Sequence, residues 1–244
     1  MRRRAALASI LILSGCSDAP DKPDEPETTW ISGPEALHAL QAAMQKSQRA
    51  AYTWDLAGQT HEGGTLKGSG AFDPHAKKVS LTTTETGPGA DPRKVVIVET
   101  DAYHWSADEK AWIRVDLTRY EPTRQGVQGD GRYNTVDPTG LKDFSRQARG
   151  VHQFNGDTYE GSLQTTLGDM PVLPLGAPNV MMDQTSDATF TARADAEGRI
   201  VSIEVKFTGQ AGPVQQTTTL GGFGEPVTVK APAKSVAVDP SYYE

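Results

Sequence analysis

The chain has 244 residues, a formal net charge of −7 and 36% hydrophobic residues. This length suits one all-β or α+β domain, or at most two small domains. The acidic balance argues against nucleic acid as a partner and against electrostatic attachment to anionic lipid.

Residues 1–15 have the pattern of a signal peptide. Three arginines at positions 2–4 precede an apolar run at 5–13 that is too short to span a bilayer. The ending Leu13-Ser14-Gly15-Cys16 resembles the lipobox of bacterial lipoproteins. That resemblance implies cleavage before Cys16 and lipid attachment to its thiol. The protein is then expected at the cell membrane, anchored by acyl chains on the extracytoplasmic face. An ordinary signal peptide with an incidental cysteine is the alternative.

Residues 16–31 are expected to form a lipidated, disordered tether, and residues 32–244 a folded domain. Between residues 17 and 29 the sequence is acidic and rich in proline, and it has no large apolar side chain to offset the entropy of ordering. Cys16 is the single cysteine of the chain, so the domain has neither a disulfide nor a thiolate metal site.

A helix is predicted after the tether, ending near residue 50. Ser32 and Glu35 have the spacing of a capping box, with a proline between them. Leu37, Leu40 and Met44 then fall at helical spacing, with polar residues on the rest of the circumference. A single apolar stripe predicts a helix of about five turns that packs on another element.

From residue 52 onward the apolar period is two, which is typical of half-buried strands. Strands are predicted at residues 52–57, 65–72, 78–85, 95–98, 102–106, 111–117, 151–154, 158–163, 188–194, 199–208, 214–220 and 227–229. Gly68 and Gly70 leave one strand face bare, as at a strong bend or where another element crosses closely. Asp137 offers an N-cap for a short second helix. The fold class is therefore α+β: one curved antiparallel sheet of about ten strands on an N-terminal amphipathic helix plus a short second helix.

No catalytic or metal-binding motif occurs in the sequence. It lacks a nucleophile elbow, a phosphate-binding glycine loop and a His-Glu-x-x-His pair. The five histidines are scattered, with no two at ligand spacing. No catalytic residue, metal site or cofactor is expected, and the protein is not expected to be an enzyme.

Several strand and turn segments resemble those of a known family. They are residues 188–200 (ATFTARADAEGRI) with the alternation that follows, residues 223–232 (FGEPVTVKAP) and the strand at 158–163 (TYEGSL). These segments resemble actinobacterial lipoproteins of the LppX, LprG and LprF group, whose fold is similar to LolA. The resemblance implies a half-open barrel closed by helices, with an apolar cavity that carries acylated lipids or lipoglycans. The threonine runs at 82–84 and 217–219 depart from that pattern, because a threonine-lined interior would hold less hydrocarbon.

Two kinds of function are compatible with these observations. The first is a carrier of a lipid or other hydrophobic ligand, in which the apolar, proline-broken segment at 167–182 covers a cavity. Its candidate ligand-binding residues are Trp54, Phe72, Leu81, Trp105, Leu173 and Met181. The alternative for these side chains is ordinary core packing. The second function is a non-catalytic envelope sensor or interaction module, binding a partner protein through its acidic surface and the polar segment at 120–134.

Overall fold

The computed structural model describes residues 29–60, 62–90, 92–119, 137, 139–163 and 188–243, with the backbone alone for Asp143. The strands in this part of the chain are β1 (Trp30–Ser32), β2 (Tyr52–Gln59), β3 (Thr65–Asp73), β4 (Lys78–Glu85), β5 (Lys94–Val98), β6 (Asp101–Ser106), β7 (Ala111–Asp116), β8 (Ala148–Phe154), β9 (Thr158–Leu163), β10 (Thr189–Ala194), β11 (Ile200–Gly209), β12 (Gly212–Gly221) and β13 (Val236–Ala237). The helices are α1 (Pro34–Ser47), α2 (Leu141–Gln147) and a short 3-10 turn, η2 (Pro240–Tyr243).

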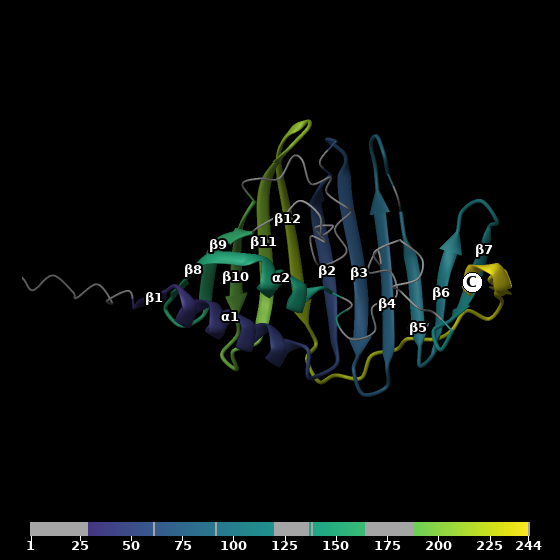
Figure 1. The fold of residues 1–244 in the computed structure, drawn as a ribbon, viewed down its shortest axis with the longest axis horizontal. Helices are drawn as coiled ribbons and strands as arrows, with labels where there is room; N and C mark the ends of the chain where they lie inside the picture. Colours follow the sequence, from purple (N-terminus) through teal and green to yellow (C-terminus); the bar gives the residue numbers. More distant parts are fainter. Residues whose placement is uncertain are drawn as a thin grey trace, which may run out of the picture.

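All of these strands belong to one curved sheet. Its order is β1-β8-β9-β10-β11-β12-β2-β3-β4-β5-β6-β7-β13. Neighbouring strands are antiparallel except for β13, which pairs with β7 in parallel. Helices α1 and α2 both lie on one face of the sheet (Figure 1), which we call the inner face. The predicted α+β class with a single open antiparallel sheet is therefore confirmed, with β1 and β13 as its free edges.

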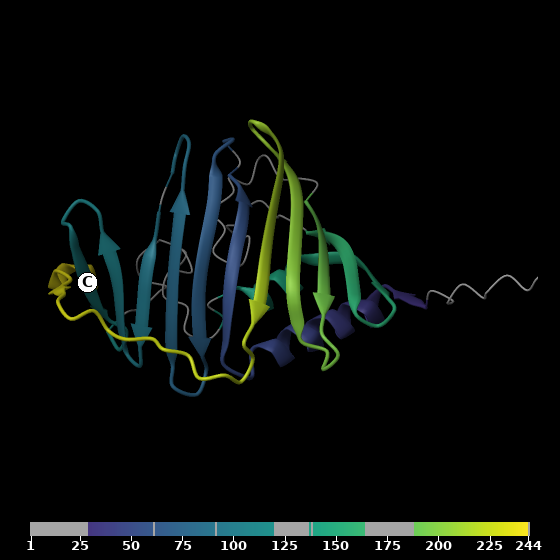
Figure 2. The same ribbon diagram turned by 180° about the vertical axis from the view of Figure 1, so that it is seen from behind.

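The sheet contains thirteen described strands, where about ten were predicted. Two short edge strands account for part of the difference. β1 pairs with β8 from Trp30 onward, within the last residues of the expected tether. β13 pairs with β7. The strand predicted at 227–229 is wrong, because these residues belong to none of the strands of the described sheet. Residues 222–235 instead run past one end of the central strands to reach β13 (Figure 2).

Side chains alternate between the two faces of each strand, as the period of two predicts. In β2, Tyr52, Trp54 and Leu56 are buried on the inner face, whereas Thr53 and Asp55 are exposed on the outer face. Residues that pair directly across neighbouring strands share a face, so this assignment extends from strand to strand. The inner face is apolar because it has to be buried, and the outer face is polar because it meets water.

Helix α1 is about a turn shorter than predicted and has no capping box. Its N-cap is Gly33, at φ 71°, and no side chain caps it. Ser32 belongs to β1, and the Gly33 N–H donates to the carbonyl of Val151 at 3.0 Å. Pairing of this segment with the sheet therefore displaces the local capping arrangement. The helix ends at Ser47, and its buried residues are Ala36, Leu40, Ala43, Met44 and Ser47.

Helix α2 forms where the sequence places it, although Asp137 is not its N-cap. That position is held by Gly140, in the left-handed region at φ 69°. The Asp137 carboxylate still accepts the backbone N–H of Lys142 at 2.9 Å, and the Gln48 side chain donates to its other oxygen. Asp137 therefore links the start of α2 to the end of α1.

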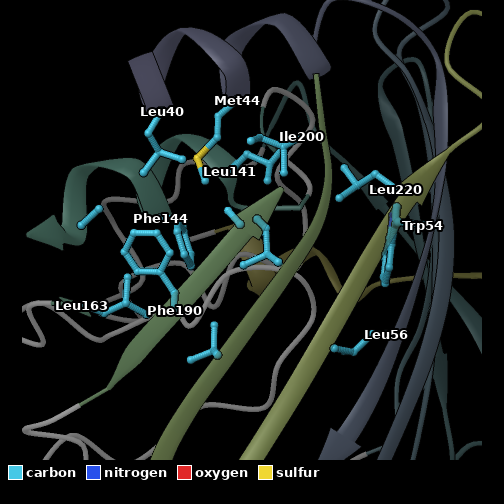
Figure 3. Packing of buried hydrophobic residues seen from close by; sticks show 14 of the residues in the cluster. Leu40, Met44, Trp54, Leu56, Leu141, Phe144, Leu163, Phe190, Ile200 and Leu220 are labelled. Atoms are coloured by element: carbon cyan, nitrogen blue, oxygen red, sulfur yellow. The ribbon is translucent and has the colours of Figure 1, made fainter. Parts of the chain in front are cut away.

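The core between the helices and the sheet is made of large apolar side chains (Figure 3). Leu40 and Met44 of α1 and Phe144 of α2 point toward the sheet, where Phe190 of β10 and Ile200 of β11 meet them. The Phe144 and Phe190 rings meet edge to face with centroids 4.9 Å apart. Burying each of these side chains contributes about 1.5–3 kcal/mol. No helix in the described ranges is long and apolar enough to cross a membrane.

Candidate functional site

A row of paired residues crosses the inner face of the sheet from β12 to β7. Except for one glycine and one histidine, its members are large and apolar. They are Leu220, Trp54, Gly70, Leu81, Val95, His104 and Ile113, in sheet order. We call this set the Trp54 row. It extends the apolar inner face well beyond the helices, and four of its members, Leu220, Trp54, Val95 and Ile113, are only 2–6% exposed.

The helices cover the other part of the inner face. In the described part of the chain, α1 packs against β1, β8, β11 and α2. Neither α1 nor α2 packs extensively against β3–β7 there. Most of the Trp54 row therefore lies away from both helices. Apolar side chains arranged in this way suit a hydrophobic partner that extends along the sheet.

The indole of Trp54 occupies the space that a side chain on Gly70 would need. A Cβ atom at Gly70 would lie 2.4 Å from both Cε2 and Cζ2 of Trp54. The sequence predicted either a strong bend or another group crossing close to the strand at this glycine. The group that crosses is the aromatic ring of Trp54. Gly70 is required here because the ring lies where a side chain of the β3 residue would stand.

Trp54 also carries a buried donor without an acceptor. The side chain is 2% exposed, and its Nε1 has no hydrogen-bond partner among the described residues. A buried N–H without an acceptor costs about 1–3 kcal/mol. Nothing in the sequence pattern signals this group, because alternation assigns Trp54 to the inner face without indicating where its N–H points.

Phe72 and Leu81 lie on the inner face with Trp54, as the sequence suggested. Phe72 is fully packed, with its ring edge-on to Tyr52 at a centroid distance of 5.4 Å. Leu81 is partly buried and pairs with both Gly70 and Val95. Leu81 is therefore the more accessible of the two.

Trp105 lies on the opposite, outer face. In β6 the inner positions are Ala102 and His104, so Trp105 points away from Trp54. Trp105 is 39% exposed. Its ring packs edge to face on that of Trp112, with centroids 5.9 Å apart, and the Lys94 Nζ lies 5.8 Å from the Trp105 ring centroid. The structure therefore does not bring Trp105 together with the other candidate residues. Cys16, Leu173 and Met181 lie outside the described residues.

The threonine runs do not line the inner face. In each run the first and third threonines lie on the outer face of the sheet. The middle one, Thr83 or Thr218, is buried on the inner face. The Thr83 hydroxyl accepts the backbone N–H of Arg93 at 3.0 Å. The period of two thus divides each run between the faces, and most threonines occupy the outer face.

A buried polar pair lies at the start of β2, on the inner face. The hydroxyls of Tyr52 and Thr139 are 2.7 Å apart. Burial raises the pKa of Tyr52 above its ordinary value, and the nearby Asp137 carboxylate raises it further, whereas the hydrogen bond with Thr139 opposes these effects. The phenol therefore stays neutral at physiological pH and joins β2 to the start of α2.

Two surface hollows lie away from the Trp54 row. One, of about 650 Å³, lies between α1 and α2 and is lined mostly by polar residues, such as Gln41, Gln45 and Arg146. The other, of about 610 Å³, lies at the rim where β2 meets the β11–β12 hairpin. Within the described ranges, no three His, Cys, Asp or Glu side chains are placed to share a metal ion.

Comparison with known proteins gives similarities to solved structures, of which two are described here. No protein-family model and no curated protein matches the chain. An uncharacterized conserved protein from Thermus thermophilus is 10% identical, with a TM-score of 0.42 over 82% of this chain and 97% of its own. A LolA superfamily protein from Nitrosomonas europaea is 8% identical, with a TM-score of 0.29 over 79% of this chain and 93% of its own. At these TM-scores neither structure informs the function of this chain.

Proposed function

We propose that the inner face binds the hydrocarbon part of a lipid or another hydrophobic ligand. The Trp54 row carries this proposal, because it forms an apolar strip from β12 to β7 on a face whose helices pack elsewhere. Of the described candidates, Trp54 and Leu81 are assigned as ligand-contacting residues, whereas Phe72 is already packed against Tyr52. Trp105 is excluded from this set by its position on the outer face.

The protein carries this ligand as a membrane-anchored lipoprotein. The lipobox-like ending at Cys16 supports an acyl anchor on the extracytoplasmic face of the cell membrane. The sequence resemblance to the LppX, LprG and LprF group supports the same function. Binding without catalysis is consistent with the absence of a catalytic motif from the sequence.

A second function, an envelope sensor that binds a partner protein, is favoured by a different surface. Trp105 and Trp112 form an aromatic pair on the outer face of β6 and β7, with Lys94 beside it. Aromatic side chains such as tryptophan are enriched in protein interfaces. Substituting Trp105 would weaken partner binding without affecting lipid binding.

Lipid content tests the carrier function. The full chain, purified from its native envelope, is extracted with organic solvent, and released lipid is quantified by mass spectrometry. We expect about one lipid per chain, and less in the Leu81→Gln variant, which places an amide on the inner face. Val96→Gln places the same group on the outer face and serves as the control. Wild-type protein without stoichiometric lipid, or equal lipid in all three proteins, would contradict the proposal.

The anchor has its own test. Cells are labelled with a palmitate analogue, and the protein is recovered and examined for label. We expect label in the wild-type protein and none in Cys16→Ala. Label that persists in Cys16→Ala would contradict attachment at this residue.

A further inference from the structure

The unpaired indole N–H of Trp54 is buried within the Trp54 row. Nε1 is bonded to Cε2, and Cε2 is one of the two ring atoms that lie closest over Gly70. The N–H is therefore on the edge of the ring that extends over β3. Because Gly70 has no side chain, the β3 residue beneath this edge offers no polar side-chain group.

The backbone beneath the ring is also committed to other bonds. Gly70 pairs with Trp54 on one side and with Leu81 on the other, within continuous antiparallel ladders. The Trp54 row on either side consists of Leu220, Leu81 and Val95, which have no hydrogen-bonding side-chain atoms. In the described part of the chain, the N–H therefore remains without an acceptor.

We infer that the Trp54 Nε1–H is the donor that selects ligands with an oxygen acceptor next to their hydrocarbon chains, as in the ester carbonyl of an acyl lipid. This inference rests on the proposed function and adds a specificity-determining residue to it. Hydrocarbon contacts alone do not distinguish an ester-linked chain from an ether-linked one. A single donor in an apolar surface does, because only the carbonyl is a good acceptor at that position.

The chemistry of the surroundings favours a neutral acceptor over an anion. Transferring a carboxylate or phosphate to an apolar surface requires a compensating charge. Indole supplies one neutral donor, and its neighbours in the row, Leu220 and Leu81, supply no charge. A carbonyl oxygen needs only one donor to be satisfied, so its chemistry matches what Trp54 offers.

The test compares two ligands that differ only at the acceptor. Dioleoylglycerol, which has ester links, and the matching dioleyl ether are each titrated into the full chain in detergent micelles. We expect the ester lipid to bind wild-type protein about five- to tenfold more tightly. In Trp54→Phe, which keeps an aromatic ring and removes the N–H, we expect the two affinities to become equal. Trp105→Phe, on the outer face, should keep the wild-type preference.

Each other outcome has a defined meaning. Equal affinities of both lipids for wild-type protein would overturn the inference and leave the proposed function intact. A preference that survives in Trp54→Phe would place the donor elsewhere and overturn it as well. Failure of both lipids to bind wild-type protein would overturn the proposed function itself.

A spectroscopic measurement on the wild-type protein does not depend on how well the variant folds. The indole N–H resonance of Trp54 should move downfield when the ester lipid binds, since a new hydrogen bond deshields the proton. The dioleyl ether should leave it nearly unmoved. An equal shift with both lipids, or none with the ester, would contradict the inference.

Discussion

The hydroxyl of Ser47, at the end of α1, accepts a hydrogen bond from the backbone N–H of Ile200, at the start of β11, across 2.7 Å. The same hydroxyl donates to the carbonyl of Ala43 at 3.0 Å, and Ser47 is fully buried. One small side chain therefore fixes the end of the helix against a hairpin that is distant in sequence. This contact sets the position at which Leu40 and Met44 meet the sheet.

Replacing Ser47 by alanine should destabilise the domain by about 1–3 kcal/mol, because it leaves the buried N–H of Ile200 without an acceptor. Urea unfolding measures the loss, and faster hydrogen exchange at Ile200 should accompany it. Ser69→Ala is the matched control, since Ser69 is exposed on the outer face of β3, and it should change stability by less than about 0.5 kcal/mol. Equal losses in the two variants would contradict the structural role of Ser47.

The two glycines of β3 should respond differently to alanine. A Cβ at Gly70 would lie 2.4 Å from the Trp54 ring and from the carbonyl oxygen of Ser80, so either the ring or the backbone must shift. We expect Gly70→Ala to cost about 1–3 kcal/mol of unfolding free energy. At Gly68 the nearest atom, the Thr83 Cγ2, is 3.2 Å away, so Gly68→Ala should cost less than about 1 kcal/mol. Thermal unfolding of both variants checks the order, and the reverse order would contradict the placement of the indole.

The alternation of apolar and polar residues is sufficient to predict most strands, because the sheet has one buried face and one solvent-exposed face. Lys78–Glu85 and Thr158–Leu163 have the predicted boundaries, and the turn at Asn155 and Gly156 has the expected positive φ angles of 50° and 78°. The order of the strands is not predictable in this way. β2 pairs with β12, which is far away in the sequence, and such pairing depends on which edges remain free.

The candidate site was also predictable only in part, because alternation describes each strand by itself. Alternation places Trp54, Phe72 and Leu81 on one face, but it does not relate the faces of strands joined by turns of different lengths. Trp105 is therefore equivalent to Trp54 in the sequence pattern, although it lies on the other side of the sheet. The unpaired Nε1 and the fit of the indole over Gly70 depend on rotamers, which a pattern of residue types does not contain.

The Asp195 carboxylate gives the stability of the β10–β11 turn an acid dependence. Burial alone would raise its pKa, but hydrogen bonds from the Arg199 backbone N–H and Nε, at 2.8 and 2.7 Å, outweigh burial and lower the pKa below its ordinary value. A lowered pKa adds stability that is present above the unfolded-state value, about 3.9, and is lost as the pH falls through the folded-state value.

Asp195→Asn should therefore be about 1 kcal/mol less stable than wild type at pH 7, and this difference should shrink below about pH 4. Urea unfolding across that range measures it. Asp55→Asn, at an exposed position of β2, controls for the loss of one negative charge. A difference between wild type and Asp195→Asn that stays constant down to pH 2 would show that the carboxylate does not act through its ionised form.

Tyr52 gives the opposite dependence at alkaline pH. Its pKa is raised, mainly by burial, so the folded state holds the neutral phenol, whereas an unfolded tyrosine ionises near pH 10. The stability from a raised pKa is complete below the unfolded-state value and is lost as the pH rises through the folded-state value, with a slope of up to about 1.4 kcal/mol per pH unit. Tyr52→Phe cannot ionise and loses the bond to Thr139, so we expect it to be about 1 kcal/mol less stable than wild type at pH 7 and to lose less stability between pH 10 and 11. Guanidinium unfolding at these pH values measures both effects, and identical alkaline slopes for the two proteins would mean that Tyr52 is not the group held neutral by folding.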